Sequence, residues 1–535
     1  MAHASCHFDH VTLRLLLIVV ATSLATSLQD ATEKPMTSDK RDVDISWYPP
    51  ARSQVNNLTS ALHASGVYGI TYGSSANPNG TPGAYDWCNM PHVRPQDYVP
   101  ADDAFELHYV ELMQRHHKRT PYASNAFPVE PYHWDCEDVR LYLYGEPLQG
   151  NRSTAVFRQG YTSSKNPFVP PGWLGSCTFP QITAGGLDDS WQHGADLYAV
   201  YHELLRFLPS RQEARQSTIT YRVTNNVITH QVAGMVVGGM WSAPGSWPLF
   251  VQAPGVDSLE PQYPCSKADS LFGSIKSGSN PEWMRHLDMS ADIFRILDDI
   301  SGVPSNDNGF HASFDHYYDN LSARQCHGKP LPCKLVDGRN STKCVSQGLA
   351  DTVYRMGHWE YSQIYRDDSS SLPASVLSLG IWIGELATHL RDVMAGRSTI
   401  LFSHHTAHDG SVSRLLSVLQ IDTMIWPGMG SEVIFELYRH KDDSMNATVG
   451  PSCDPDSCLR PTIKHEASFA ARKNSTALRS SPSGFYIRVL FGGMVLTSSN
   501  PSLGRIDMLP VELLLNYLEE LTGKGGRLIK GKCKG

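Results

Sequence analysis

Residues 105–121 read FELHYVELMQRHHKRTP, an apolar stretch followed by a turn of two arginines, two histidines and a lysine. The apolar and aromatic residues at its start predict a β-strand. In the turn, His116 stands between Arg115 and Arg119. Two fixed cations lower the pKa of an imidazole and keep it neutral, and their forked donors match the oxygens of a phosphate group. The turn therefore suits phosphoryl transfer through a histidine; the alternative is a basic surface turn after a strand.

The pattern of strand, polar turn and helix is predicted twice more along the chain. One strand is predicted at 217–223 with a helix at 227–237, and another at 398–402 with a helix that His408 and Asp409 open. Strands that alternate with helices indicate an α/β fold with a mainly parallel sheet flanked by helices. In such sheets ligands bind at the carboxyl ends of the strands, so we expect the three polar turns to share one site.

The chain divides into a leader, an extension and one domain. Residues 1–27 predict a cleaved signal peptide, because a short apolar run follows Arg14 and small residues follow the run; a retained membrane anchor is the alternative. We expect no other membrane contact. Residues 28–100 predict an irregular N-terminal extension rich in Pro, Gly, Asn and Ser. The domain at 101–535 is predicted from a core at about 101–130 and 375–535, core segments near 180–240, and a mostly helical cap inserted within about 130–370.

Charge restricts the ligands of this 535-residue chain. The formal net charge is −8, so no basic excess exists to neutralise a nucleic-acid backbone, and we expect no nucleic-acid partner. An anionic ligand would have to be held by a local cluster of cations, such as the one around His116.

Cysteines and glycosylation motifs both predict secretion. Ten of the eleven cysteines lie beyond the predicted signal peptide and predict up to five disulfides. Close spacing suggests Cys453 with Cys458, and a pair within Cys326, Cys333 and Cys344. Seven Asn-x-Ser/Thr motifs begin at Asn57, Asn79, Asn151, Asn320, Asn340, Asn446 and Asn474.

The turn at His408 and Asp409 is a second candidate for the site. A helix N-terminus aims free N–H groups at an anion, although Asp409 as a simple N-cap is the alternative. Together with His404 and His405, His408 could suggest a metal site. Adjacent histidines in a strand point to opposite faces, so we expect neither a metal nor a cofactor.

Arg115-His116-x-x-Arg119-x-Pro121, followed much later by His408-Asp409, resembles the histidine acid phosphatases, the second branch of the histidine phosphatase superfamily. Two further segments are similar to the family pattern: 181–187 to a Gln-Leu-Thr-x-x-Gly helix entry, and 221–224 to an Arg-Ser-Thr strand end. The resemblance covers about residues 100–525. It implies a phosphoglycerate-mutase-like α/β fold with a large, mostly helical cap.

The resemblance also implies roles for single residues. His116 would be the nucleophile and Asp409 the proton donor, and the phosphate would be bound by Arg115, Arg119, Arg222 and His408. The implied protein is a secreted acid phosphatase that hydrolyses small-molecule phosphate monoesters through a phosphohistidine, with an acidic optimum because Asp409 must be protonated. The alternatives are a phytase-type inositol phosphate phosphatase and a catalytically attenuated secreted binding or signalling protein of the same fold.

One position departs from the family pattern. His117 stands where the family has glycine, a residue normally used where the backbone turns sharply or approaches a ligand closely. The imidazole could narrow the pocket, add a titrating contact or disable turnover. We expect an active enzyme with altered specificity, because His116, both arginines and the His-Asp pair remain.

Overall fold

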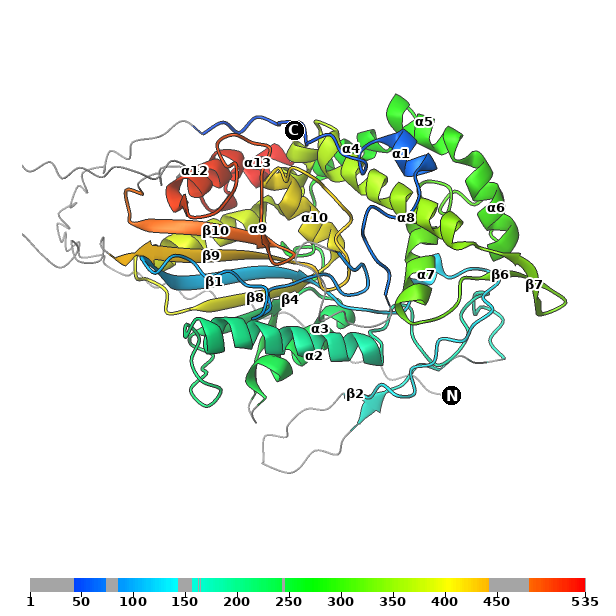
Figure 1. The fold of residues 1–535 in the computed structure, drawn as a ribbon, viewed down its shortest axis with the longest axis horizontal. Helices are drawn as coiled ribbons and strands as arrows, with labels where there is room; N and C mark the ends of the chain where they lie inside the picture. Colours follow the sequence, from blue (N-terminus) through cyan, green and yellow to red (C-terminus); the bar gives the residue numbers. More distant parts are fainter. Residues whose placement is uncertain are drawn as a thin grey trace, which may run out of the picture. The chain divides into compact units, whose positions relative to one another are not determined.

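An eight-stranded mixed sheet carries the fold, in the order β11-β10-β9-β1-β8-β4-β5 with β12 paired to β10 (Figure 1). The computed structural model describes residues 43–73, 85–142, 156–161, 163, 165–242, 246–441 and 481–534. The strands of the sheet are β1 Phe105–Arg115, β4 Ile219–Val223, β5 Leu249–Val251, β8 Phe402–Ala407, β9 Glu432–His440, β10 Phe485–Phe491, β11 Met494–Val495 and β12 Leu509–Pro510.

Half of this sheet is parallel and half is antiparallel. Strand β8 lies between β1 and β4 and is parallel to both, and β5 is parallel to β4. Strand β9 is antiparallel to β1, and β10 is antiparallel to β9. The predicted α/β class is confirmed, and the parallel strands are those that carry the three predicted polar turns.

Helices cover both faces of the sheet. Successive side chains of a strand point to opposite faces, so Met113 of β1 packs in a core with α9, α10 and α12, whereas Leu112 packs in a second core with α2 and α3. These helices lie above and below the sheet in Figure 1. Their bounds are α2 Ala184–Tyr198, α3 Val227–Trp241, α9 Ser371–Met394, α10 Asp409–Val418 and α12 Val511–Thr522.

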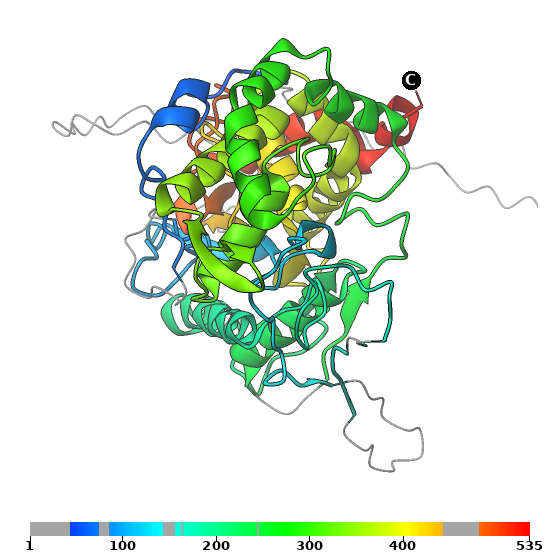
Figure 2. The same cartoon turned by 90° about the vertical axis from the view of Figure 1, so that its right-hand side faces the viewer.

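A further layer of helices lies at the end of the sheet where β1 and β8 finish, nearest the viewer in Figure 2. It has a hydrophobic core of its own, which includes Trp87, Phe314 and Trp359. The layer falls within the stretch for which a helical cap is predicted. Its helices are α5 Pro281–Met289, α6 Ala291–Ser301, α7 Asp315–Cys326 and α8 Gln347–Ser362.

The remaining elements are short. The helices are α1 Leu58–His63, α4 Ser266–Ile275 and α13 Ile529–Lys532, with π-helical turns at Ala199–Leu204 and Gln363–Asp367 and 3-10 turns at Ala123–Asn125 and Lys524–Gly526. Two small two-stranded sheets pair β2 Leu141–Tyr142 with β3 Phe157–Arg158 and β6 Cys333–Val336 with β7 Arg339–Cys344. Residues 43–73 and 85–100 belong to the same compact unit as the rest of the described chain.

The strand before the His-Asp pair lies later in the chain than predicted. We predicted a strand at 398–402 and then a polar turn, but β8 spans Phe402–Ala407 and is buried throughout. The polar residues are accepted in the strand because their imidazoles have buried partners: His404 Nε2 lies 2.7 Å from Gln114 Oε1, and His405 Nε2 lies 3.0 Å from Glu111 Oε1. The two histidines point to opposite faces of the sheet, as their spacing predicts.

Four disulfides lie in the described residues. They join Cys88 to Cys326, Cys136 to Cys177, Cys265 to Cys533, and Cys333 to Cys344. The last is a pair within the predicted trio, whereas Cys326 bonds to Cys88 across 238 residues, a partner that close spacing could not indicate. The predicted Cys453–Cys458 pair lies outside the described residues. Disulfides are typical of proteins that fold in an oxidising compartment.

The described glycosylation motifs differ in exposure. Asn57 and Asn340 are exposed, whereas Asn320 is fully buried in α7. The Asn320 amide donates to the carbonyl of Asn125, and its oxygen accepts from Arg324 Nε. Asn320 is therefore not a glycosylation site in the folded protein, because its side chain has no access to solvent. The motifs at Asn79, Asn151, Asn446 and Asn474 lie outside the described residues.

Helix α9, at Ser371–Met394, is long and apolar enough to cross a membrane, whereas the sequence leads us to expect no membrane contact beyond the leader. In the structure 78% of its apolar window is buried against the rest of the domain, so it serves as a core helix. The predicted signal peptide at 1–27 lies outside the described residues.

Candidate active site

The ends of β1 and β8 bring the two sequence motifs together. Arg115, the last residue of β1, is in register with Ala407, the last residue of β8. The backbone N–H of His116 donates to the carbonyl of Ala407 over 3.1 Å. The rings of His116 and His408 consequently lie 5.5 Å apart, centroid to centroid. Parallel pairing therefore joins residues that are almost 300 positions apart in the chain.

Among the described residues, one ring nitrogen of His116 has a hydrogen-bond partner and the other has none. Its Nδ1 lies 3.0 Å from the carbonyl oxygen of His117. A carbonyl can only accept, so Nδ1 carries the proton and the lone pair of the neutral ring is on Nε2. Burial, Arg119 and Arg115 hold the pKa of His116 well below its usual range. The side chain therefore stays neutral and nucleophilic in acid.

Both arginines of the first motif are buried, and both lower the pKa of His116. Arg115 donates from Nη1 to the carbonyl of Pro427 and from Nη2 to Asp409 Oδ2 over 3.0 Å. Arg119 donates from Nη1 to Asp319 Oδ1 over 3.0 Å. Among the described residues, the buried Nε of each arginine has no hydrogen-bond partner. A bound oxyanion could satisfy such donors.

Asp409 is the first residue of α10 rather than its N-cap, which is His408. Its Oδ2 accepts from Trp426 Nε1 over 2.8 Å as well as from Arg115, and its Oδ1 accepts from the N–H of Gly410. Burial raises the pKa of Asp409, but Arg115 and the Trp426 hydrogen bond outweigh burial and lower it overall. The carboxyl group is therefore ionised while the site is empty.

His408 is neutral and is held by Thr224, the residue that directly follows β4. Its Nε2 lies 2.9 Å from Thr224 Oγ1 and 3.4 Å from Glu260 Oε1. Burial lowers the pKa of His408 to about 4. Burial, with Asp257 nearby, raises the pKa of Glu260 to about 7. A carboxyl group that titrates near neutral pH thus borders the site, and no sequence motif indicated it.

Arg222 does not join this group in the structure. Its Nη1 donates to Glu385 Oε2 over 2.7 Å, and its Nη2 donates to Asp257 Oδ1 and Ser258 Oγ over 3.1 and 2.8 Å. Both terminal nitrogens are occupied by partners other than His116 and its neighbours. Arg222 lies two residues before Thr224, the residue of this segment that reaches His408. Its buried Nε, like those of Arg115 and Arg119, has no hydrogen-bond partner among the described residues, so the phosphate contact of Arg222 stays a prediction.

His117, at the position where the family pattern has glycine, directs its ring away from His408 and Asp409. Its Nε2 lies 3.1 Å from both Gln114 Nε2 and His193 Nδ1, and the residue is fully buried. The ring therefore belongs to the core beneath α2 and not to the group around His116.

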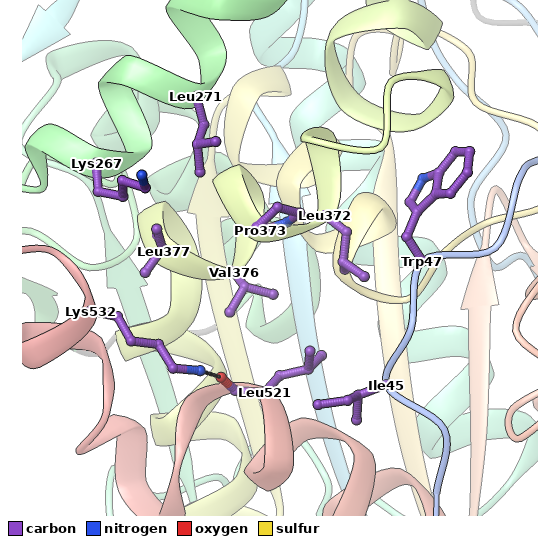
Figure 3. Close-up of a pocket in the computed structure, with 10 residues that line it drawn as sticks. All are labelled: Ile45, Trp47, Lys267, Leu271, Leu372, Pro373, Val376, Leu377, Leu521 and Lys532. Atoms are coloured by element: carbon purple, nitrogen blue, oxygen red, sulfur yellow. Dashed lines mark hydrogen bonds between the residues drawn. The ribbon is translucent and has the colours of Figure 1, made fainter. Parts of the chain in front are cut away.

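Figure 3 shows a separate hollow of about 500 Å³ that none of the predicted site residues lines. Its walls come from α4, α9, α12, α13 and the segment around Trp47, and they are mainly apolar, with Lys267 and Lys532 as the charged members. Lys532 Nζ donates to the carbonyl of Leu521. No His, Cys, Asp or Glu cluster suited to a metal was found among the described residues.

No protein-family model matches this chain, and no curated protein matches it. Solved structures do match. A phytase from Klebsiella sp ASR1 is 13% identical over 79% of this chain and 97% of its own, with a TM-score of 0.41. The phytase from Citrobacter braakii is 12% identical over 78% and 98%, with a TM-score of 0.46. A Bifidobacterium longum multiple inositol polyphosphate phosphatase, in complex with inositol hexasulfate, is 11% identical over 77% and 92%, with a TM-score of 0.41.

Proposed function

We propose that this protein is an acid phosphatase of the histidine acid phosphatase type, which hydrolyses phosphate monoesters through a phosphohistidine on His116. The observation that carries the proposal is the state of His116. Its Nδ1 is held by the carbonyl of His117, so Nε2 keeps a free lone pair, and burial with two neighbouring arginines keeps the ring neutral. A neutral imidazole with an oriented lone pair is a competent nucleophile toward phosphorus.

Arg115 and Arg119 bind the phosphate in this proposal, and His408 adds a third contact. Each arginine has a buried Nε donor that lacks a partner among the described residues. Phosphate oxygens would satisfy these donors and would be neutralised by the two guanidinium groups, which also stabilise the transition state. Arg222 has the same kind of buried Nε without a partner among the described residues, while its terminal nitrogens contact Glu385, Asp257 and Ser258. It is proposed as a further phosphate contact through this Nε.

The reaction has two steps. In the first, His116 Nε2 attacks phosphorus, the bond from phosphorus to the leaving oxygen breaks, and Asp409 donates a proton to that oxygen. In the second, water attacks phosphorus, the N–P bond breaks, and Asp409 takes the proton from the water. No metal or cofactor takes part in this scheme.

Asp409 gains its proton on substrate binding. The carboxyl group is ionised in the empty site because Arg115 and Trp426 lower its pKa. A phosphate group that engages Arg115 weakens this pair and adds negative charge beside the carboxylate, which raises the pKa of Asp409. Protonation from solution or from a monoanionic substrate is easiest in acid, so the proposed activity has an acidic optimum.

Secretion and glycosylation belong to the proposal as well. The four disulfides of the described residues support an oxidising compartment. Asn57 and Asn340 are the exposed glycosylation candidates among the described residues.

Hydrolysis of an aryl phosphate at pH 4 to 6 tests the chemistry. His116→Ala should lower the rate by about 10³-fold or more, because it removes the nucleophile. His63→Ala, an exposed histidine in α1, is the matched control and should keep wild-type activity. Wild type quenched with radioactive phosphoester should carry an acid-labile label on His116. Equal rates for wild type and His116→Ala would contradict the assignment, and no activity in either would favour the binding or signalling protein.

A substrate panel tests the choice of phosphoester. It compares inositol phosphates, sugar phosphates and phosphopeptides at equal concentration for wild type and His117→Gly. A strong preference for inositol hexakisphosphate would turn the proposal toward the phytase-type alternative. Similar rates across the panel would support a general acid phosphatase.

A further inference from the structure

The ring of His117 contacts residues from two elements, β1 and α2. Gln114 comes from β1 and His193 from α2, and each places a nitrogen 3.1 Å from His117 Nε2. The rings of His117 and His193 meet edge to face, with centroids 5.3 Å apart. All three residues have no exposed surface, so the ring cannot turn without displacing a packed neighbour.

The hydrogen bonds of the His117 ring continue through His193 to Glu432, the first residue of β9. His193 Nε2 lies 2.9 Å from Glu432 Oε2, and Glu432 Oε1 accepts the backbone N–H of Val93 over 2.8 Å. His92 stacks on His193 with centroids 4.0 Å apart. Burial is the first cause that keeps the pKa of both His117 and His193 well below the usual range. Neutral imidazoles offer one donor and one acceptor each, which suits a chain of hydrogen bonds.

The opposite side of the His117 ring rests on Gly430. This glycine has φ +74°, and a Cβ added to it would lie 2.3 Å from His117 Cε1 and 2.7 Å from Nδ1. Only glycine fits at this position while residue 117 is histidine. The Gly430 N–H also donates to the carbonyl of His116 over 3.0 Å, and the Ser431 carbonyl accepts from the N–H of Arg115 over 2.8 Å.

The backbone carbonyls of His116 and His117 are thus both held by hydrogen bonds. The carbonyl of His116 is bound by Gly430, and the carbonyl of His117 accepts from His116 Nδ1. The same loop supplies the Pro427 carbonyl that holds Arg115 Nη1. Where the family pattern has glycine, no side chain is available to anchor this peptide.

We propose that His117 is a positioning residue. Its buried imidazole, held between Gly430 and the His193–Glu432 pair, fixes the backbone of His117, and the carbonyl of His117 orients His116 for attack. This inference rests on the proposed role of His116 as the nucleophile. The ring neither narrows the phosphate pocket nor titrates against the substrate. It sets the position and tautomer of the imidazole next to it.

The kinetic test separates positioning from binding. His117→Gly should lower kcat for an aryl phosphate by about 10- to 100-fold, because a displacement of about 1 Å is enough for such a loss. KM and inhibition by inorganic phosphate should change by less than about threefold, because Arg115 and Arg119 remain. His117→Gln, which keeps a polar group near the position of Nε2, should recover most of kcat. His389→Gln is the matched control. His389 lies in α9 and contacts Glu111 on the opposite face of the sheet, so this variant should keep wild-type kcat.

Gly430 provides a second variant. Gly430→Ala alone should lower kcat about as much as His117→Gly, because its Cβ would meet the imidazole. The double variant should be less impaired than the product of the two single losses, because the clash is absent once residue 117 is glycine. Losses that simply multiply, an unchanged kcat in folded His117→Gly, or an equal loss of phosphate binding would each overturn the proposal.

A measurement without turnover separates this inference from the proposed function. Nitrogen NMR of ¹⁵N-histidine-labelled protein reports which nitrogen of His116 carries the proton. Wild type should show protonated Nδ1 alone, and His117→Gly should show a mixture of tautomers. An inactive wild type would refute the phosphatase proposal, and the tautomer of His116 would still decide the positioning role. The same single tautomer in both proteins would refute positioning even if wild type is an active phosphatase.

Discussion

Two buried histidine–carboxylate groups lie on opposite faces of the sheet and differ in charge. On the α9 face, Glu111 contacts His389 Nδ1 over 3.1 Å and His405 Nε2 over 3.0 Å. On the α2 face, Glu432 contacts His193 Nε2 over 2.9 Å. Burial opposes the charge of Glu111, but His389 and His405 lower its pKa overall, and Glu111 raises the pKa of His389. The α9 group is therefore an ion pair.

The α2 group remains close to neutral. Burial raises the pKa of Glu432 to about 7 and lowers the pKa of His193 well below its usual value. The difference follows solvent access: the side chain of His389 is 43% exposed, whereas that of His193 is 0% exposed. Water can solvate an imidazolium at the edge of the domain but not beneath α2. The same residue types thus give a charged pair on one face of the sheet and a neutral pair on the other, near His116.

The largest expected effect is the difference in unfolding free energy when the carboxylate of each group is removed. Glu111→Leu should lower the free energy of unfolding by about 3–5 kcal/mol at pH 6, because it leaves buried polar partners uncompensated. Glu432→Leu should cost only about 1–2 kcal/mol, the scale of a lost neutral hydrogen bond. Urea unfolding of both variants measures the two costs. The comparison breaks if Glu432→Leu is the more destabilising of the two.

The pH dependence of stability should have opposite signs on the two faces. The pKa of Glu432 is raised from 4.5 to about 7 in the folded protein, so its contribution is complete below pH 4.5 and is lost as pH rises to 7, roughly 3 kcal/mol in all. Glu111 has a lowered pKa, so its contribution is complete above pH 4.5 and is lost in acid. Unfolding of Glu432→Gln and Glu111→Gln from pH 3 to 8 should show opposite slopes against wild type. Parallel slopes would contradict the assignment.

A smaller effect is expected at the edge of the site. Glu260 has a pKa raised to about 7 and lies 3.4 Å from His408 Nε2, so it becomes negative as pH rises through 7 and repels a phosphate dianion. Glu260→Gln should raise the ratio of activity at pH 8 to activity at pH 5 by about threefold, since it removes a charge at a partly exposed position. A complete pH–rate profile measures the ratio. An unchanged alkaline limb would exclude Glu260 as its cause.

The smallest effect is expected at His389. Its pKa is raised by Glu111, so its contribution to stability is present below pH 6.5 and is lost as pH rises through the higher folded pKa. His389→Gln should cost less than about 1 kcal/mol at pH 5, because the side chain is partly exposed, and less still at pH 9. A cost that grows with pH would show that the pair is not ionic.

Much of the fold and part of the candidate site could be predicted locally. The stretch 105–113 predicts a strand because its residues favour extended backbone, and Asn226 caps α3 where the sequence places a capping turn. His404 and His405 point to opposite faces, as the twofold repeat of a strand requires. The predicted start of β8 is too early in the chain. The polar residues of this strand are typical of a turn, and only the structure shows that Gln114 and Glu111 are their buried partners.

Arg222 and Glu260 mark the limit of such predictions. A strand motif cannot tell which carboxylates lie opposite an arginine, so the contacts of Arg222 with Glu385, Asp257 and Ser258 could not be foreseen. Glu260 belongs to no motif, and its raised pKa arises from burial and from Asp257. The partner of Cys326 could not be predicted from spacing either, because Cys88 is 238 residues away.

By itself, the sequence determined the α/β class, the neutral histidine between two arginines and the acidic residue that opens a helix, since these depend on residue types and short spacings. Only the tertiary structure decided that β1 and β8 pair in parallel and that His117 faces Gly430 and His193. It also decided that the terminal nitrogens of Arg222 contact Glu385, Asp257 and Ser258. Contacts between distant segments, and the loss of water that sets each pKa, exist only after the chain has packed.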